Sequence, residues 1–158
     1  MLIRRLEAED WEAVAAVYAA GIASRNATFE KEVPGWEAWD AAHLPEHRLV
    51  AEREGRLVGW AALSPVSARG CYAGVAEDSV YVAADAQGHG VGRALLERLL
   101  ADSEAAGIWT VQTSVFPDNV ASVALHVACG FRIVGTRERI ARLDGEWRDV
   151  LFMERRAP

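Results

Sequence analysis

The chain has little lysine, little cysteine and no long hydrophobic run. Its 158 residues contain a single lysine, Lys31, and the 16 arginines are scattered instead of clustered. With a net charge of −6, the protein lacks the basic surface of a general nucleic-acid binder. The chain contains no run of about 18 apolar residues, which is the length needed to cross a membrane. Its N-terminus lacks the apolar stretch of a secretion signal. We therefore expect a cytoplasmic protein that binds neither nucleic acid nor membrane.

The two cysteines, Cys71 and Cys129, are far apart and fit neither a CxxC pair nor a zinc-binding spacing. We expect reduced thiols and no metal site. Hydrophobic residues make up 51% of the chain and charged residues 25%, which is typical of a folded globular protein. The length predicts one domain that spans residues 1–158.

Alternating hydrophobic periods predict a mixed α/β domain. Apolar steps of three and four residues indicate helices, and short apolar runs bounded by turn residues indicate strands. The predicted order is β-α-α-β-β-β-α-β-α-β-β, from which a mixed sheet with helices on its faces follows. The expected helices are 10–23, 36–44, 90–106 and 119–128, and the expected strands are 2–5, 48–52, 57–63, 77–83, 109–115, 131–140 and 148–154.

A glycine-rich segment joins a predicted strand to the clearest predicted helix. It reads Gln87-Gly88-His89-Gly90-Val91-Gly92-Arg93. Glycine lets the backbone approach a ligand closely, and the free N–H groups of a helix start attract an anion. Three alternating glycines exceed what a plain turn needs, so the segment indicates a pyrophosphate site. No Gly-Lys-Ser/Thr follows, which excludes a Walker loop, and the spacing departs from the Gly-x-Gly-x-x-Gly of dinucleotide-binding folds.

The same segment resembles the Gln/Arg-x-x-Gly-x-Gly/Ala signature of the GNAT N-acetyltransferase superfamily. The later run 119–131 is similar to the family's Asn-x-x-Ser-x-x-Leu/Tyr…Gly-Phe/Tyr segment. The resemblance covers essentially the whole chain, because the order of elements also matches. It implies the GNAT fold, with a mostly antiparallel, twisted sheet of about seven strands and helices on both faces. It also implies acetyl-CoA as the acetyl donor.

The resemblance further implies which residues hold acetyl-CoA. The loop amides would bind the pyrophosphate, and the strand 80–82 would pair through its backbone with the pantetheine arm. Asn119 would contact that arm, and its place at a helix start also fits an N-cap. The implied cofactor-binding residues are Val80, Tyr81, Val82, Gln87, Gly88, His89, Gly90, Val91, Gly92, Arg93, Asn119 and Ser122.

Four segments resemble one subgroup, the phosphinothricin and methionine sulfoximine acetyltransferases. They are residues 18–30, 64–72, 77–82 and 145–150. The subgroup acetylates the α-amino group of small amino acids whose side chains end in a tetrahedral, oxygen-bearing group. Its members are usually homodimers, so the resemblance implies a homodimer here. Many members carry Lys or His shortly before the late glycine, where this chain has Asp144.

Acetyl transfer to an amine needs a proton acceptor, and a carboxylate is a natural one. Glu77 lies at the start of the strand that leads to the glycine loop, and it matches the proposed base of the subgroup. By strand alternation, Glu77 shares a face with Ser79 and Tyr81, while Asp78 faces the other way. Glu77 is the predicted base, Asp78 is the fallback, and a plain surface residue is the alternative for Glu77.

The leaving sulfur needs a proton donor, and here the sequence leaves several open. Many GNAT enzymes use a tyrosine on the helix that follows the Asn segment, where this chain offers His126. A histidine exchanges protons near neutral pH, although a structural role for His126 fits its helix equally well. Tyr72 and Tyr81 are other candidate donors.

The carboxylate of an amino-acid acceptor calls for a cation, and the planar fork of an arginine binds it with two hydrogen bonds. Arg69 is our candidate, in a loop shared with Gly70 and Cys71, with an exposed loop arginine as the alternative reading. Phe29 could form an apolar wall near Glu30, or belong to the core. Two other functions stay open, which are a non-catalytic acyl-CoA-binding module and an acetyltransferase of protein or peptide amines.

Overall fold

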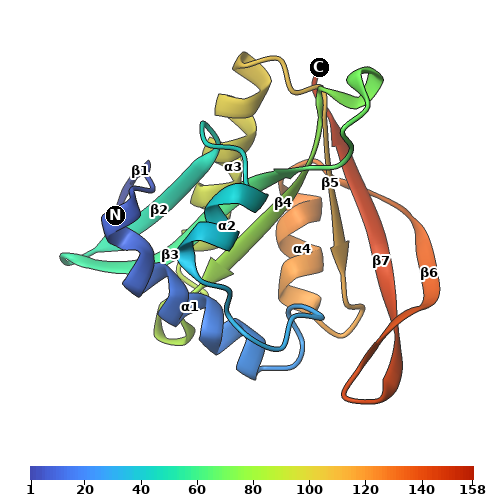
Figure 1. Ribbon diagram of the computed structural model, residues 1–158, viewed down its shortest axis with the longest axis horizontal. Helices are drawn as coiled ribbons and strands as arrows, with labels where there is room; N and C mark the ends of the chain where they lie inside the picture. The colour runs from blue at the N-terminus through green and yellow to red at the C-terminus, as the bar shows by residue number, and fades with distance from the viewer.

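The computed structural model describes all 158 residues and contains one seven-stranded sheet in the order β1-β2-β3-β4-β5-β7-β6 (Figure 1). Neighbouring strands are antiparallel except for β4 and β5, which are parallel. No helix has the length and apolarity that crossing a membrane requires. The strands are β1 Leu2–Arg5, β2 Arg48–Arg53, β3 Arg56–Pro65, β4 Val75–Val82, β5 Thr110–Val115, β6 Arg132–Leu143 and β7 Glu146–Arg156, and the α-helices are α1 Trp11–Ala23, α2 Trp36–Ala42, α3 Val91–Ala105 and α4 Val120–Ala128.

Every predicted helix and strand is present, and the predicted fold class is confirmed. The largest difference is the last hairpin, in which β6 and β7 extend further toward each other than predicted. Asp144 and Gly145 both adopt positive φ angles, of 50° and 81°, and turn the chain in two residues. Such a tight turn lets the two strands pair up to Leu143 and Glu146.

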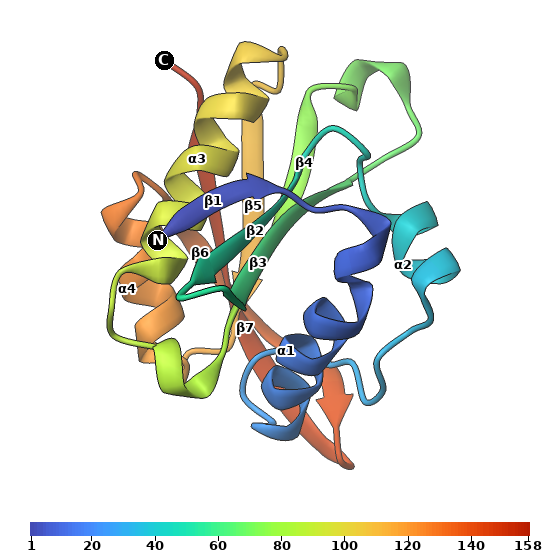
Figure 2. The ribbon, with the colours of Figure 1, turned by 90° about the vertical axis from the view of Figure 1, so that its left-hand side faces the viewer.

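Helices cover both faces of the sheet, as Figure 2 shows with α1 and α2 on one side and α3 and α4 on the other. Alternate residues of the central strands point to the two layers. On the α3 side, Leu95 and Leu99 pack with Ala61 and Leu63 of β3 in the main core. On the α1 side, the intervening residue Ala62 packs in the second core instead. Burial on both faces explains the long apolar run of β3.

Aromatic rings fix the position of α1 against the sheet. Tyr81 of β4 stacks on Trp60 of β3, with ring centroids 4.9 Å apart and an interplanar angle of 19°. Tyr18 of α1 contacts both rings, at 5.4 Å from Trp60 and 4.9 Å from Tyr81. The helix passes so close to Tyr81 that only glycine fits at position 21, since a Cβ there would lie 2.6 Å from the ring.

The strands β4 and β5 separate after three paired residues. The last pair joins Glu77 to Gln112, whereas β4 continues beside β3 as far as the pair of Val82 with Gly59. Figure 1 shows the two strands diverging from this point, with α4 beside the gap. The edge of β4 from Asp78 onward therefore has no neighbouring strand on the β5 side.

We expect Gly21→Ala to destabilise the fold although alanine favours a helix interior by about 1 kcal/mol over glycine. The added methyl group meets the Tyr81 ring, which Trp60 and Tyr18 hold in place. Overpacking of this kind costs about 1–3 kcal/mol, which urea denaturation would measure. Gly135→Ala is the matched control, because nothing lies within 4 Å of a Cβ at that position. Equal stabilities of the two variants would contradict this packing.

Candidate active site

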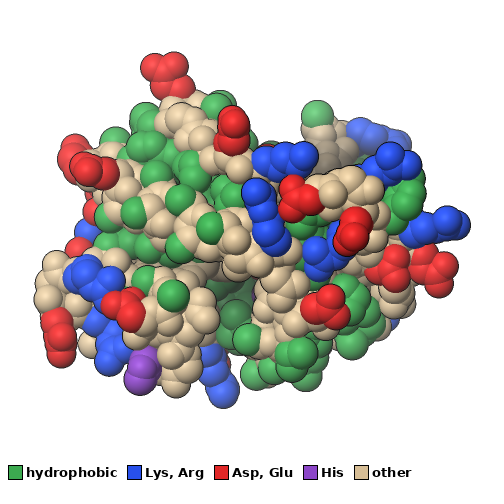
Figure 3. Space-filling view, turned by 90° about the horizontal axis from the view of Figure 1, so that it is seen from below, with side chains coloured by type: hydrophobic (Ala, Val, Ile, Leu, Met, Phe, Trp, Pro, Cys, Tyr) green, Lys and Arg blue, Asp and Glu red, His purple; other side chains and the backbone are tan.

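A cavity of about 930 Å³ occupies the opening between β4 and β5. Its walls come from the end of α1 and the loop after it, from β4, from the glycine loop, from the end of β5 and from α4. Seen from below, this end of the molecule is hollowed near its middle, with charged side chains on both sides of the hollow (Figure 3). The cavity thus reaches both faces of the sheet where the two strands part.

The glycine loop forms the floor of the cavity at the start of α3. Gly88 and Gly90 both have positive φ angles, of 78° and 79°, which glycine adopts without steric cost. Gly90 is the N-cap of α3 and has no side chain to accept hydrogen bonds, so the first N–H groups of the helix are free for a ligand. Gln87 folds back and donates from Nε2 to the Val82 carbonyl oxygen at 3.2 Å.

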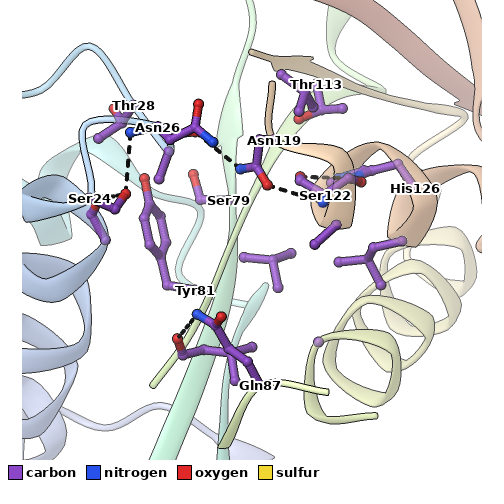
Figure 4. Close-up of a pocket in the computed structure, with 18 of the residues that line it drawn as sticks. Ser24, Asn26, Thr28, Ser79, Tyr81, Gln87, Thr113, Asn119, Ser122 and His126 are labelled. Carbon is purple, nitrogen blue, oxygen red and sulfur yellow. Dashed lines mark hydrogen bonds between the residues drawn. The ribbon is translucent and has the colours of Figure 1, made fainter. Parts of the chain in front are cut away.

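Asn119 links the two sides of the cavity. Its Oδ1 accepts from the Ser122 N–H at 3.2 Å and caps α4, and its Nδ2 donates to the Asn26 carbonyl oxygen at 3.2 Å. The Asn26 N–H donates in turn to Ser24 Oγ at the end of α1. Figure 4 shows this chain of polar groups above Ser79 and Tyr81 of β4. The predicted N-cap is confirmed, and the loop after α1 is tied to α4.

Glu77 lies where β4 and β5 separate. Gln112 of β5 donates from Nε2 to Glu77 Oε1 at 3.3 Å. Burial raises the pKa of Glu77, and the nearby Asp78 adds to this, while the hydrogen bond from Gln112 and the charge of Arg137 oppose it. A carboxylate with a raised pKa is a stronger base than an ordinary glutamate once it is ionised.

Asp78 points to the other face of β4 and pairs with His126 of α4. Asp78 Oδ1 and His126 Nε2 lie 2.9 Å apart, and the two side chains are 1% and 3% exposed. His126 Nδ1 lies 2.7 Å from the Ser122 carbonyl oxygen. Burial opposes charge on the imidazole, but the hydrogen bond and charge of Asp78 outweigh it and raise the pKa of His126. The predicted alternation of β4 is confirmed by this pair.

Most of the residues predicted to form the site line this one cavity. The exceptions are His89 and the segment Arg69 to Tyr72, which are exposed and do not line the cavity of this chain. Arg69 instead lies over the Tyr72 ring, 5.7 Å from its centroid. The predicted residues that line the cavity are Phe29, Glu30, Glu77, Val80, Tyr81, Val82, Gln87, Gly88, Gly90, Val91, Gly92, Arg93, Asn119, Ser122 and His126.

Residues that were not predicted from the sequence support the site from other elements of the fold. Gln112 holds Glu77 across the last strand pair, and nothing in its own segment marks it. Arg148 of β7 lies over the Phe116 ring, 4.0 Å from its centroid, and donates to the Arg25 carbonyl oxygen at 3.2 Å. Phe116 in turn contacts Phe29 edge-on at 4.9 Å. These contacts join separate elements that are more than 30 positions apart in the sequence, so no local pattern could reveal them.

Comparison with known proteins places this chain in one family. The sequence profile described as "Acetyltransferase (GNAT) family" matches residues 3–131. A phosphinothricin N-acetyltransferase of Alcaligenes faecalis is 38% identical over 162 residues, covering 97% of this chain and 81% of the relative. An L-methionine sulfoximine/L-methionine sulfone acetyltransferase of Pseudomonas paraeruginosa is 26% identical over 158 residues, covering 96% and 92%.

Solved structures give the same result. A ribosomal-protein-alanine N-acetyltransferase from Brucella melitensis superposes with a TM-score of 0.90 at 32% identity, over 99% of this chain and all of the other. A phosphinothricin acetyltransferase from Sinorhizobium meliloti, solved in complex with acetyl-CoA, gives 0.87 at 28% identity, over 98% of this chain and 87% of the other.

The cavity also fits acetyl-CoA, which the Sinorhizobium meliloti enzyme holds in its solved structure. The free edge of β4, the glycine loop with two positive φ angles and the open start of α3 lie along one wall of it. These are the features that a backbone-bound arm and a pyrophosphate require. The chain belongs to the GNAT family of acetyltransferases, and acetyl-CoA is its acetyl donor.

Proposed function

We propose that the protein transfers the acetyl group of acetyl-CoA to the α-amino group of a small amino acid. The acceptor class is that of phosphinothricin and of methionine sulfoximine or sulfone, whose side chains end in a tetrahedral, oxygen-bearing group. Support comes from the relatives that are named for these compounds and from the cavity lining, in which Phe29 and Glu77 lie together. The observation that carries the proposal is a half-buried carboxylate with a raised pKa at the point where β4 and β5 separate.

Glu77 is the proposed base. An amino acid arrives as an ammonium ion and must lose a proton before its nitrogen can attack the thioester carbonyl. Glu77 accepts that proton only when it is ionised, so the rate rises as the pH rises through the raised pKa of Glu77. Gln112 holds the carboxylate in place and, by donating a hydrogen bond, stabilises its charged form.

Other walls of the cavity would bind acetyl-CoA and supply the proton for the leaving sulfur. Gly88, Gly90 and the start of α3 would hold the pyrophosphate, and the free edge of β4 would pair with the pantetheine arm. Acetyl-CoA supplies the activated acetyl group as a thioester. On the α4 side, His126 with its partner Asp78 is the proposed source of the proton for the leaving sulfur. Tyr72 is exposed and outside the cavity, so its role stays a prediction.

Two arginines are candidates for the acceptor carboxylate. Arg69, inferred from the sequence, lies outside the cavity with Gly70 and Cys71, and its role stays a prediction, as do the homodimer and the cytoplasmic location. Arg137 of β6 is not among the residues that line the cavity either, but its charge acts on the base. It lies over the Phe152 ring at 5.4 Å, forms no ion pair in the fold, and lowers the pKa of Glu77 through its charge. We propose Arg137 as the cation that holds the carboxylate, next to the base.

The Brucella relative favours a second candidate function, which is acetylation of a protein or peptide amine.

The two candidate functions are tested together by measuring the thiol released from acetyl-CoA with a panel of acceptors. The panel contains methionine sulfoximine, methionine sulfone, phosphinothricin, ordinary amino acids, a polyamine and a peptide that begins with alanine. We expect turnover with the first three compounds. Turnover confined to the peptide would replace the proposal with the second function, and tight acetyl-CoA binding without any turnover would contradict both.

We expect Glu77→Gln to lower kcat on the order of 10²–10⁴-fold, which is the usual contribution of a general base. Gln keeps the shape of the side chain and can still accept from Gln112, so the fold and acetyl-CoA binding should persist. The rise of the rate with pH should also disappear. Steady-state kinetics and calorimetric titration of acetyl-CoA measure these effects, with the exposed Glu12→Gln as the matched control. Unchanged turnover would remove Glu77 from the mechanism.

We expect Arg137→Ala to raise KM for the amino-acid acceptor about 10–100-fold, the effect of losing a charged hydrogen bond of about 1.5–3 kcal/mol. KM for acetyl-CoA should stay unchanged, and the pH profile should move to higher pH, because Arg137 lowers the pKa of Glu77. Arg142→Ala is the matched control, since Arg142 lies on the same strand over the Trp147 ring. If Arg69→Ala, measured in parallel, shows the larger effect, Arg137 is not the carboxylate site.

A further inference from the structure

Both ring nitrogens of His126 face oxygen acceptors. Nδ1 is 2.7 Å from the Ser122 carbonyl oxygen, which can only accept, so Nδ1 carries a hydrogen. Nε2 is 2.9 Å from Asp78 Oδ1, and an ionised carboxylate also only accepts. A second proton must therefore lie between Nε2 and Oδ1. An imidazole is a stronger base than a carboxylate, so this proton resides on the ring, and the pair holds one proton more than a neutral imidazole and a carboxylate.

The pair is closed to solvent and has one unsatisfied atom. The ring of Phe131 meets the His126 ring edge-on at 4.9 Å and covers it. Asp78 Oδ2 is buried and no donor of the chain reaches it. An unsatisfied buried carboxylate oxygen is costly, and in native proteins it calls for a specific explanation. Asp78 and His126 both line the cavity, but both N–H groups of His126 are engaged, so the buried and unpaired Oδ2 of Asp78 is the polar atom of the pair that is left for a group bound there.

Two other ionisable groups interact with the pair. Glu77 is its neighbour on β4 but faces the opposite side of the sheet, and the charge of Asp78 raises the pKa of Glu77. Cys129 follows the end of α4, and its pKa is raised mainly by burial, with a smaller contribution from Asp78. Both effects favour protonated neighbours next to Asp78. Neither group forms a hydrogen bond with the pair.

We propose that Asp78 is a catalytic residue on the acetyl-CoA side of the cavity, through which the buried Asp78–His126 pair supplies the proton of the leaving sulfur. His126 is then a positioning residue that stores the proton and keeps the charge of Asp78 balanced. The assignment rests on the proposed acetyl transfer and refines it, because it names the atom by which the pair meets the ligand. On this assignment, the adjacent carboxylates of Glu77 and Asp78 act as base and acid on opposite faces of β4.

Glu77 and the Asp78–His126 pair together account for every proton that moves in the reaction. The amine nitrogen forms a bond to the acetyl carbon, the carbon–sulfur bond breaks, and the sulfur leaves with the bonding electron pair and takes a proton from Asp78. Of the two protons that the ammonium loses by way of Glu77, one is released to water. The other balances the proton that the Asp78–His126 pair gives up to the sulfur and regains from water after CoA leaves, so the enzyme ends in its starting state.

The first test reads the protonation of His126 directly. The ¹⁵N chemical shifts of the histidine rings, measured across pH 6–9, should show both nitrogens of His126 protonated at pH 7 in the wild type. In Asp78→Asn, the amide can donate to Nε2, so the ring should become neutral while every hydrogen bond of the ring is kept. Asp102→Asn, at an exposed site on α3, is the matched control. A neutral His126 in the wild type at pH 7 would overturn the proposal.

The second test separates Asp78 from His126 by kinetics. Asp78→Asn should lower kcat about 100-fold or more and leave the Kd of acetyl-CoA within about threefold, since the pair loses its proton but not its packing. His126→Gln should lower kcat about tenfold or less, because His126 positions Asp78 and does not itself meet the ligand. A loss in His126→Gln equal to or greater than that in Asp78→Asn would overturn the assignment to Asp78. Turnover of Asp78→Asn within threefold of the wild type would also overturn it, even if His126→Gln does not fold.

The two proposals fail in different ways. If the wild type acetylates no amino acid of the panel but does acetylate the peptide, the proposed acceptor is wrong, and both tests of Asp78 can be carried out with the peptide. If the amino acids are acetylated and Asp78→Asn turns over normally, the proposed function holds and the role of Asp78 is wrong. The NMR measurement needs no acceptor and is therefore independent of both outcomes.

Discussion

The site depends on the early end of pairing between the two parallel strands of the sheet. β4 and β5 share only the pairs from Val75–Thr110 to Glu77–Gln112, and beyond them β4 keeps β3 as its single neighbour. Unpaired backbone groups inside a protein need hydrogen-bond partners. The N–H and C=O groups on the free edge of β4 are therefore available to bind a ligand. The same separation opens the sheet from one face to the other, and the donor and the acceptor can therefore approach one point from opposite sides.

Adjacent residues on a strand face opposite sides of the sheet, and here that simple rule places two carboxylates in two environments. Glu77 is held by Gln112 and faces the side on which Arg137 lies. Asp78 is sealed against α4 by His126 and Phe131. Burial raises the pKa of the first, whereas the second raises the pKa of His126 through a hydrogen bond and its charge, against the effect of burial. Separated environments of this kind are the usual way in which one site holds a base and an acid at the same pH.

The two sides of the opening are held by contacts of different kinds. On the α1 side, the rings of Tyr18, Trp60 and Tyr81 fix the helix by stacking. The loop after α1 is held by the hydrogen bond from Asn119 to the Asn26 backbone and by Phe29, which packs against Phe116. A loop secured by a few hydrogen bonds can adjust to a ligand more readily than a packed helix.

The sequence by itself determined the order of the elements, the family and the glycine loop, and it supplied the candidate base, because these features lie in short local patterns. The spacing of apolar residues predicts helices and strands, and the alternation of side chains along β4 predicts the face on which Glu77 lies. It did not determine what touches those residues. The partners Gln112 of Glu77 and His126 of Asp78 come from other elements, and the exposed position of Arg69 depends on how its loop folds. Such pairings are set by packing over long sequence separations, and only the tertiary structure could decide them.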